Sequence, residues 1–209
     1  MRSLALFLAL GLALAAEFAA FTVEPAGDQV VDLTTGVTTL PSGGRLVDAE
    51  RGLVLVADFI EYKEGAFVRA KKARLDQGKV HFEAGALDYR VAAGRVRLTG
   101  GVAFSAPFLK GLKADAGRLD LKARVAVLTG HVASQDPAFT ARTLVADTRT
   151  GEVLLLGDFA YRDPGLGIEL TGKGKDARLY LKLAEGKEPE ARTAVPPEVL
   201  RRLTAFLKE

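Results

Sequence analysis

Few residues of this chain have side chains that could carry out catalysis. The sequence contains no cysteine, which excludes disulfides, thiolate metal sites, cysteine nucleophiles and a lipidated N-terminal cysteine. Its two histidines, His81 and His131, are far apart in the sequence, and no H-x-x-x-H, H-E-x-x-H or C-x-x-C motif is present to bind zinc. We therefore expect no metal site and no cofactor.

The other common catalytic motifs are also missing. No G-x-S-x-G, P-loop or strand-to-helix G-x-G-x-x-G occurs, and Gly172-Lys173-Gly174-Lys175 lacks the Walker spacing, so it predicts a hairpin turn. Aspartates recur near the ends of the expected strands, a pattern that favours turn and edge roles over a carboxylate pair for acid–base chemistry. These aspartates are Asp58, Asp115, Asp120, Asp147 and Asp158. We expect that the protein is not an enzyme.

A short phrase repeats in the middle of the chain. It stands as Leu98-Thr99-Gly100-Gly101-Val102, as Leu128-Thr129-Gly130-His131-Val132 and as Leu155-Leu156-Gly157-Asp158-Phe159, at steps of 30 and 27 residues. A fixed period indicates a repeated supersecondary unit, and this period suits two antiparallel strands with their turns. Glycine followed by Gly, His or Asp tolerates positive φ, so each phrase predicts a tight turn or a β-bulge.

Apolar and charged residues alternate around these phrases. Val96 and Leu98 alternate with arginines, and Leu119 and Leu121 alternate with Arg118, Asp120 and Lys122. A period of two places apolar side chains on one face of a sheet and charges on the other. Strands of this kind recur from about residue 30 to residue 183, which predicts an all-β antiparallel sandwich, barrel or roll.

The two ends of the chain differ from this pattern. Residues 1–15 combine a basic start, an apolar run and small residues before Ala16, so we expect a cleavable signal peptide, with an uncleaved membrane anchor as the alternative, and an exported, periplasmic protein. Residues 184–195 are polar and are expected to be a linker between the β domain, residues 16–183, and a C-terminal helix, residues 196–209. The apolar face of that helix predicts either a cap over an open end of the sheet or a docking helix for a membrane or partner. It comprises Val199, Leu200, Leu203, Phe206 and Leu207.

The overall charge is nearly balanced. The 209 residues include 29 basic and 26 acidic residues, for a net charge of +3 and a pI of about 9.2. The excess is spread along the chain, with no basic run interleaved with aromatic residues, so we expect no nucleic-acid partner. The small positive excess remains compatible with an acidic ligand or with peripheral contact to a membrane.

The repeated phrases resemble those of the OstA/LptA family of periplasmic lipopolysaccharide-transport proteins. Members carry diffuse repeats of an apolar strand, Thr-Gly-Asn-Val, a variable strand and Ala-Asp. The similarity covers about residues 53–183, where Ala114-Asp115 and Ala146-Asp147 follow the first two phrases, whereas Gly101, His131 or Asp158 replaces the usual Asn. The resemblance implies a jelly-roll-like antiparallel β-roll, V-shaped in section, whose apolar inner faces hold acyl chains and whose ends stack on like domains.

This resemblance implies a set of lipid-facing residues on the strands that match. They are Val96, Leu98, Val102, Phe104, Leu119, Leu121, Val125, Val127, Val153, Leu155, Phe159, Ile168 and Leu170. Basic side chains at the rim of the roll are candidates to hold anionic headgroups, with an ordinary solvated face as the alternative for each. They are Arg95, Arg97, Lys110, Lys113 and Arg124.

The sequence is therefore compatible with two functions. The first is a periplasmic carrier or bridge that moves lipopolysaccharide or a similar glycolipid or lipid toward the outer membrane, stacking by its edge strands on itself or on other envelope-transport components. The second is an exported structural β-repeat protein that scaffolds the envelope without lipid. If the first is right, Phe104→Asp or Val127→Asp is expected to abolish lipid retention, and an open apolar trough rather than a closed core is expected.

Overall fold

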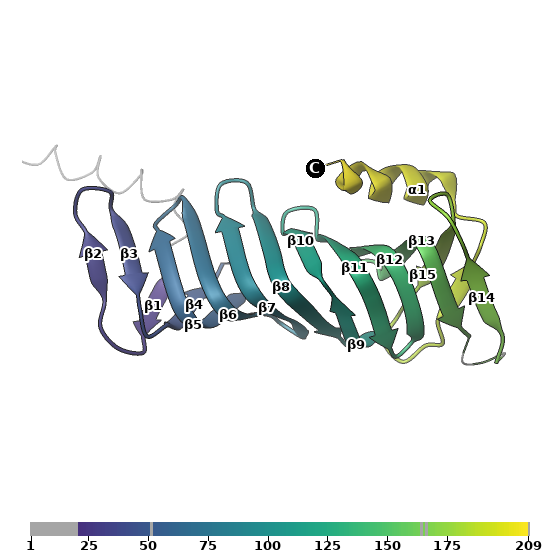
Figure 1. Cartoon of the computed structure of the whole chain (residues 1–209), viewed down its shortest axis with the longest axis horizontal. Coiled ribbons are helices and arrows are strands. Elements are labelled where there is room, and N and C mark those ends of the chain that lie inside the picture. The colour runs from purple at the N-terminus through teal and green to yellow at the C-terminus, as the bar shows by residue number, and fades with distance from the viewer. Residues whose placement is uncertain (1–20, 51, 164, 166, 209) are drawn as a thin grey trace, which may run out of the picture.

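Sixteen strands form one antiparallel sheet in the computed structural model, which describes residues 21–50, 52–163, 165 and 167–208 (Figure 1). The expected signal peptide, residues 1–15, lies outside the described residues. The predicted all-β class and the antiparallel roll with a short C-terminal helix are confirmed. In chain order the strands are β1 (Thr22–Pro25), β2 (Val30–Asp32), β3 (Val37–Leu40), β4 (Gly44–Asp48), β5 (Leu53–Lys63), β6 (Phe67–Gln77), β7 (Val80–Arg90), β8 (Arg95–Ala106), β9 (Leu109–Ala114), β10 (Ala116–Asp120), β11 (Val125–Gln135), β12 (Ala138–Asp147), β13 (Glu152–Arg162), β14 (Glu169–Gly172), β15 (Arg178–Lys182) and β16 (Glu190–Arg192).

The pairing of the strands divides the sheet into two half-sheets. The long strands β5 to β8 and β11 to β13 contribute one half of their length to each. The first half-sheet has the order β1-β4-β5-β6-β7-β8-β9-β11-β12-β13-β14. The second has the order β2-β3-β5-β6-β7-β8-β10-β11-β12-β13-β15-β16.

The positions where the long strands change half-sheet lie side by side and form what we call the crease. Its residues are Asp58, Lys72, Gly85, Gly100, Gly101, Asp115, Gly130, His131, Arg142, Gly157 and Asp158. The register shifts there between β7 and β8, between β11 and β12, and between β12 and β13. Of the two predicted roles for the repeated phrase, the bulge is therefore correct, because each strand continues through its Gly-x pair instead of turning back.

Positive φ angles explain why these phrases need glycine. Gly130 has φ +72° and is followed by His131 at φ +43°, and Gly157 has φ +78°. A Cβ at Gly157 would also lie 2.9 Å from the Cβ of Arg142 on the neighbouring strand. Both the backbone conformation and the close approach of β12 therefore exclude a side chain at this point of the crease.

The two half-sheets face each other across one apolar core. Leu55 and Leu75 of the first half-sheet line the same small cavity as Leu87 and Val96 of the second. The core continues along the roll as far as Leu179, Leu181 and Leu183 at its C-terminal end. The period of two seen in the sequence thus places one set of side chains between the half-sheets, where burial of each large aliphatic group contributes roughly 1.5–3 kcal/mol.

The C-terminal helix does not cap an open end of the sheet. α1 (Pro197–Thr204), extended by the 3₁₀ turn η1 (Ala205–Leu207), lies over the outer face of the second half-sheet (Figure 1). Val199 and Leu203 of the helix are buried there against outward-facing residues of four strands, β11, β12, β13 and β15. We call this group the outer-face cluster; its strand residues are Val125, Val127, Val145, Leu154 and Tyr180.

The predicted linker is also partly wrong. Residues 184–195 contain β16, whose Ala191 pairs with Leu181 of β15, so the sheet extends beyond residue 183. β16 has only three residues, and two of them, Glu190 and Arg192, are exposed and charged. Short, charged strands are typical of sheet edges, and this polar composition hid the strand from a reading based on apolar alternation.

Candidate functional site

The space between the half-sheets is the site that the sequence predicted for an acyl chain. Most of the predicted lipid-facing residues do lie in this inner core or pack against it. Leu98 is 1% exposed and Phe104 is 5% exposed, and the rings of Phe104 and Phe82 lie 4.7 Å apart. The predicted residues found at the inner core are Val96, Leu98, Val102, Phe104, Leu119, Leu121, Val153, Leu155, Phe159 and Leu170.

Three predicted residues lie elsewhere. Val125 and Val127 face outward and pack beneath the C-terminal helix, whereas their neighbours Ala126 and Leu128 face the inner core. Ile168 is 48% exposed in the turn before β14. An uninterrupted apolar run such as residues 125–128 is typical of a strand that is buried on both faces, and this signal could have separated the two sets. Because Val127 does not face the inner core, the structure gives no reason for Val127→Asp to abolish lipid retention.

The inner core is nearly filled. A cavity of only about 20 Å³ remains between the half-sheets, on the side opposite the crease, which we call the mouth. Phe21 and Leu121, both half-buried, line it together with Tyr89, and the rings of Phe21 and Tyr89 form a T-shaped pair with centroids 6.3 Å apart. This volume is about that of one water molecule, so the described residues form a closed core and not the open trough that a lipid groove predicted.

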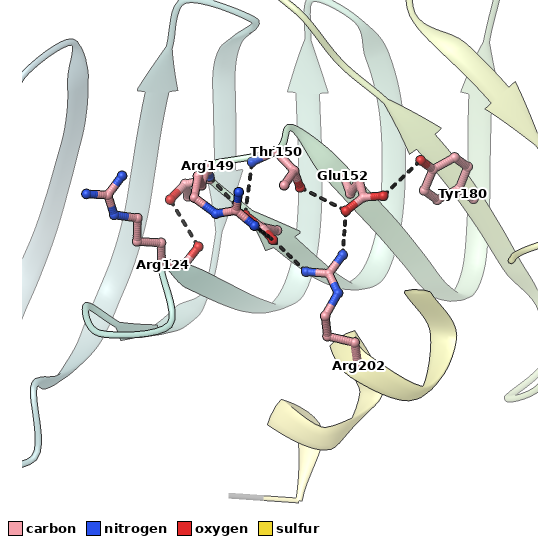
Figure 2. Close-up of polar contacts among 8 residues, drawn as sticks. Arg124, Arg149, Thr150, Glu152, Tyr180 and Arg202 are labelled. Carbon is pink, nitrogen blue, oxygen red and sulfur yellow. Dashed lines mark hydrogen bonds and ion pairs between the residues drawn. The ribbon is translucent and has the colours of Figure 1, made fainter. Parts of the chain in front are cut away.

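The five predicted headgroup residues do not form one cluster. Arg95 and Arg97 lie on the outer face of the second half-sheet, where they line a cavity next to the helix. Lys113 lines a shallow hollow near the crease, and Lys110 is exposed at the start of β9. Arg124 lies in the turn between β10 and β11 with φ +57°, and its side chain points away from the neighbouring polar network (Figure 2). No single anionic group could contact all five.

The most concentrated polar network joins the helix to the sheet. The Arg202 guanidinium donates to Asp147 Oδ2 at 2.5 Å and also to Glu152, as Figure 2 shows. Asp147, whose side chain is only 3% exposed, accepts further hydrogen bonds from the backbone N–H groups of Arg149 and Thr150 at 2.9 and 3.0 Å. Glu152 accepts from the hydroxyls of Thr150 and Tyr180. A buried carboxylate is therefore fully hydrogen-bonded, and one arginine fixes the helix on its strands.

This network changes the acidity of its members. Burial alone would raise the pKa of the Asp147 carboxyl, but the Thr150 and Arg149 N–H groups and the Arg202 guanidinium bring that pKa below its ordinary value. The pKa of Glu152 is lowered in the same way, against burial, by Thr150 and Arg202. Both carboxylates are thus held ionised by donors, which suits a structural clamp and not a general acid.

The aspartates and histidines that the sequence singled out have structural partners. Asp120 and Asp147 accept hydrogen bonds from turn N–H groups, as predicted. The crease aspartates instead contact basic side chains: Asp58 forms an ion pair with Lys72 at 3.2 Å and Asp158 with Arg142 at 2.6 Å, and Asp115 Oδ2 lies within hydrogen-bond distance of His131 Nδ1 at 2.7 Å. His81 Nδ1 lies 2.6 Å from Asp76 Oδ1. Among the described residues, no group of three or more His, Asp or Glu side chains is placed to hold a metal ion.

Comparison with known proteins adds no relative. No family model matches the sequence, and no curated protein matches it. In the part of the chain that the structure describes, no helix is long and apolar enough to cross a membrane. The roll, its inner core and its outer face are therefore the features from which a function can be inferred.

Proposed function

We propose that this protein binds the acyl part of a lipid between its two half-sheets and acts as a periplasmic carrier or bridge. Its cargo would be lipopolysaccharide or a similar lipid moving toward the outer membrane. The observation that supports this most is the continuous apolar inner surface, which runs from the β4–β5 region around Leu46 to Leu181 near the end of the roll. No polar group is required for affinity along such a surface, because each buried CH₂ contributes ~0.8 kcal/mol.

The construction of the roll supplies a way to admit an acyl chain. The half-sheets are connected covalently along the crease, and among the described strands every β-ladder runs within a half-sheet, so none crosses the mouth. Opening the mouth therefore separates apolar side chains but breaks no ladder. A chain of a dozen carbons offers on the order of 10 kcal/mol before binding costs, which offsets the lost packing of only a few large aliphatic side chains, so the mouth opens only locally to admit the chain.

The ends of the roll support a bridging arrangement. β1 and β2 end the two half-sheets at the N-terminal side, and β14 and β16 end them at the C-terminal side. Val30 and Val31 of β2 are 58% and 47% exposed, and Leu33 beside them is 92% exposed. An apolar edge strand invites pairing with another strand, so a second roll is a suitable partner at this end.

Native lipid content is the test of the proposal. The protein is purified without detergent from its own cell envelope, and extracted lipid is quantified by mass spectrometry. We expect about one glycolipid or phospholipid per molecule, and a clear loss in Leu121→Gln, which places an amide at the mouth. Leu207→Gln is the matched control. Leu207 is exposed at the end of the C-terminal helix and does not line the mouth, so this variant should retain the lipid.

A second candidate function is supported by the filled core. With a cavity of only about 20 Å³ between the half-sheets, the roll is already stable as a closed scaffold for an envelope layer. Protein that is free of lipid in the same preparation would overturn the carrier proposal and favour this one. Equal lipid content in the wild type and in both variants would show adventitious lipid and would also count against the carrier.

A further inference from the structure

A second cavity lies on the opposite side of the sheet from the inner core. It has a volume of about 300 Å³ and is found on the outer face of the second half-sheet, where the C-terminal helix ends. Val125, Val127 and Phe206 give it an apolar floor and one wall, and its remaining side chains are mainly charged. We call it the outer-face cavity. Its volume is within the range of small-molecule sites.

The register of the strands explains the charge of this cavity. One cross-strand row runs from Asp88 on β7 through Arg97 on β8 and Arg118 on β10 to Val127 on β11. The next row runs from Arg90 through Arg95 and Asp120 to Val125. Four arginines and two aspartates therefore gather on three strands beside an apolar floor, which leaves a net charge of +2 at the cavity.

Two like-charged pairs stand directly opposite each other in these rows. Arg90 is the cross-strand partner of Arg95, and Arg97 is that of Arg118. Like charges at such positions destabilise a sheet, and the acidic residues offset this only in part. The Oδ1 atom of Asp88 lies 2.9 Å from Nε of Arg90, and the Oδ2 atom of Asp120 lies 3.9 Å from Nε of Arg95. Among the residues that the structure describes, the second arginine pair has no carboxylate within ion-pair distance.

Arg97 and Arg118 are the arginines that could receive a ligand. Arg118 donates to the carbonyl oxygen of Phe206 at 3.0 Å, which holds its guanidinium at the helix end above the cavity. In the described part of the chain, no carboxylate lies within ion-pair distance of Arg97. The exposed Arg97 is thus the cross-strand neighbour of Arg118, whose guanidinium is held in place by its hydrogen bond. Both arginines lie at the border of the apolar floor. This arrangement suits a planar or tetrahedral anion with an apolar substituent.

We propose that the outer-face cavity binds a small amphiphilic anion, a phosphate monoester or carboxylate that carries a compact apolar group. The anionic group contacts Arg97 and Arg118, and the apolar group lies on Val125, Val127 and Phe206. Such chemistry occurs in free metabolites and in the headgroup region of acidic lipids. The site is separate from the proposed acyl-chain site, because the side chains that would contact the ligand, those of Arg97, Arg118, Val125, Val127 and Phe206, are not part of the inner core.

Phenyl phosphate is a suitable probe. Binding is followed by heteronuclear NMR of the purified protein at low salt, with inorganic phosphate as the comparison ligand. We expect saturable binding with shifts confined to β7, β8, β10, β11 and η1, and tighter binding of phenyl phosphate than of inorganic phosphate. Arg97→Gln should weaken phenyl phosphate binding about tenfold or more while the dispersion of the amide spectrum is retained.

Arg192→Gln is the matched control, because Arg192 is an exposed strand arginine that pairs with Glu190 and does not line the cavity. The absence of saturable binding of any probe, or equal weakening by both variants, would overturn the proposal. Equal affinity for inorganic and phenyl phosphate would overturn the role of the apolar floor. Flotation with vesicles of phosphatidic acid in phosphatidylcholine identifies the source: binding that needs Arg97 and the acidic lipid indicates a headgroup, whereas phenyl phosphate binding without flotation indicates a free metabolite.

Discussion

Arg202 is the single side chain that most strongly connects two parts of this molecule. Its guanidinium joins the C-terminal helix to Asp147 and Glu152 on the outer face of the sheet (Figure 2). Loss of the guanidinium would leave the Asp147 carboxylate, which is 3% exposed, with only the more distant guanidinium of Arg149, 3.9 Å from its Oδ2, as a cation. Removing one partner of a buried, hydrogen-bonded charge pair is destabilising, unlike removing an exposed surface pair.

We therefore predict that Arg202→Met lowers the free energy of unfolding by about 2 kcal/mol. The remaining N–H donors to Asp147 keep the loss below that of an isolated buried charge. Arg201→Met is the control, since Arg201 is exposed on the same helix and should change stability by less than about 0.5 kcal/mol. Urea unfolding monitored by circular dichroism measures both. Equal effects of the two variants would contradict the role given to Arg202.

The same network predicts a dependence of stability on pH. The pKa values of Asp147 and Glu152 are lower in the folded protein than their ordinary values, so the folded state binds protons less tightly than the unfolded chain. Their contribution is complete above the unfolded pKa values, about 3.9 and 4.3, and is lost as pH falls through the lower folded values. The free energy of unfolding should thus fall below about pH 4, and less steeply in Arg202→Met. Parallel pH profiles of the two proteins would contradict this.

At the scale of the elements, the crease allows one long strand to contribute to both half-sheets. One strand of eleven residues, such as β11, serves both half-sheets because Gly130 and His131 let it bend without ending. A Cβ at Gly130 would lie 2.3 Å from Asp115 Oδ2 and 2.9 Å from Asp115 Cβ, whereas a Cβ at Gly101 would meet no atom within 4 Å. Both glycines have positive φ, so the pair separates backbone strain from crowding.

Gly101→Ala should lower the free energy of unfolding by about 1 kcal/mol, the cost of a left-handed backbone for a residue with a Cβ. Gly130→Ala should lower it by at least about 1 kcal/mol more, because the added methyl group displaces Asp115 from its contact with His131. Chemical denaturation of the two variants checks the difference. Identical losses would mean that only φ, and not the close approach of the Asp115 side chain, demands glycine at the crease.

The helix is the element whose position the sequence predicted least well. Its apolar face was correct, since Val199 and Leu203 are buried, Leu200 and Phe206 are partly buried, and only Leu207 remains 36% exposed. Its partner was wrong, because the surface that receives it belongs to strands whose outer faces were expected to be polar. Tertiary packing therefore converted the outer face of β11, β12, β13 and β15 into a second core.

At the scale of the whole molecule, the roll is elongated and has unlike ends (Figure 1). The N-terminal end exposes the valines of β2, and the C-terminal end carries the short β14 and the charged β16. Val56 provides a comparison, because it is 43% exposed but lies on β5, which is paired on both sides, with β4 and β6, and is not an edge strand. The side chains of Val31 and Val56 are thus similarly exposed, but Val31 lies on an edge strand and Val56 does not.

We predict that any association of one roll with another is lost in Val31→Lys and kept in Val56→Lys. A lysine on an edge strand disfavours pairing with a further strand, whereas one in the middle of a sheet face does not reach the edge. Sedimentation equilibrium across a concentration series measures the association constant. An association that survives Val31→Lys but disappears in Val56→Lys would place the contact on the outer face instead of the end.

The class of the fold and its repeat can be predicted from local patterns in the sequence. Period-two alternation can be satisfied only by strands with one buried face, and Gly-x pairs about 30 residues apart had to be turns or bulges. These are local properties, set by the geometry of the backbone. They also placed Leu98, Phe104, Leu155 and their equivalents on the inner core without knowledge of the partners.

Features that depend on contacts between distant residues become known only from the folded structure. It assigned Val125 and Val127 to the outer face, because the C-terminal helix, far along the chain, buries that face. It closed the inner core to a cavity of about 20 Å³, since the fit between two half-sheets depends on the side chains of both. It also brought Arg97 and Arg118 together through register, which a one-residue shift would reverse. Alternation along a strand shows which residues lie on the same face of the sheet, but not which part of the chain covers that face.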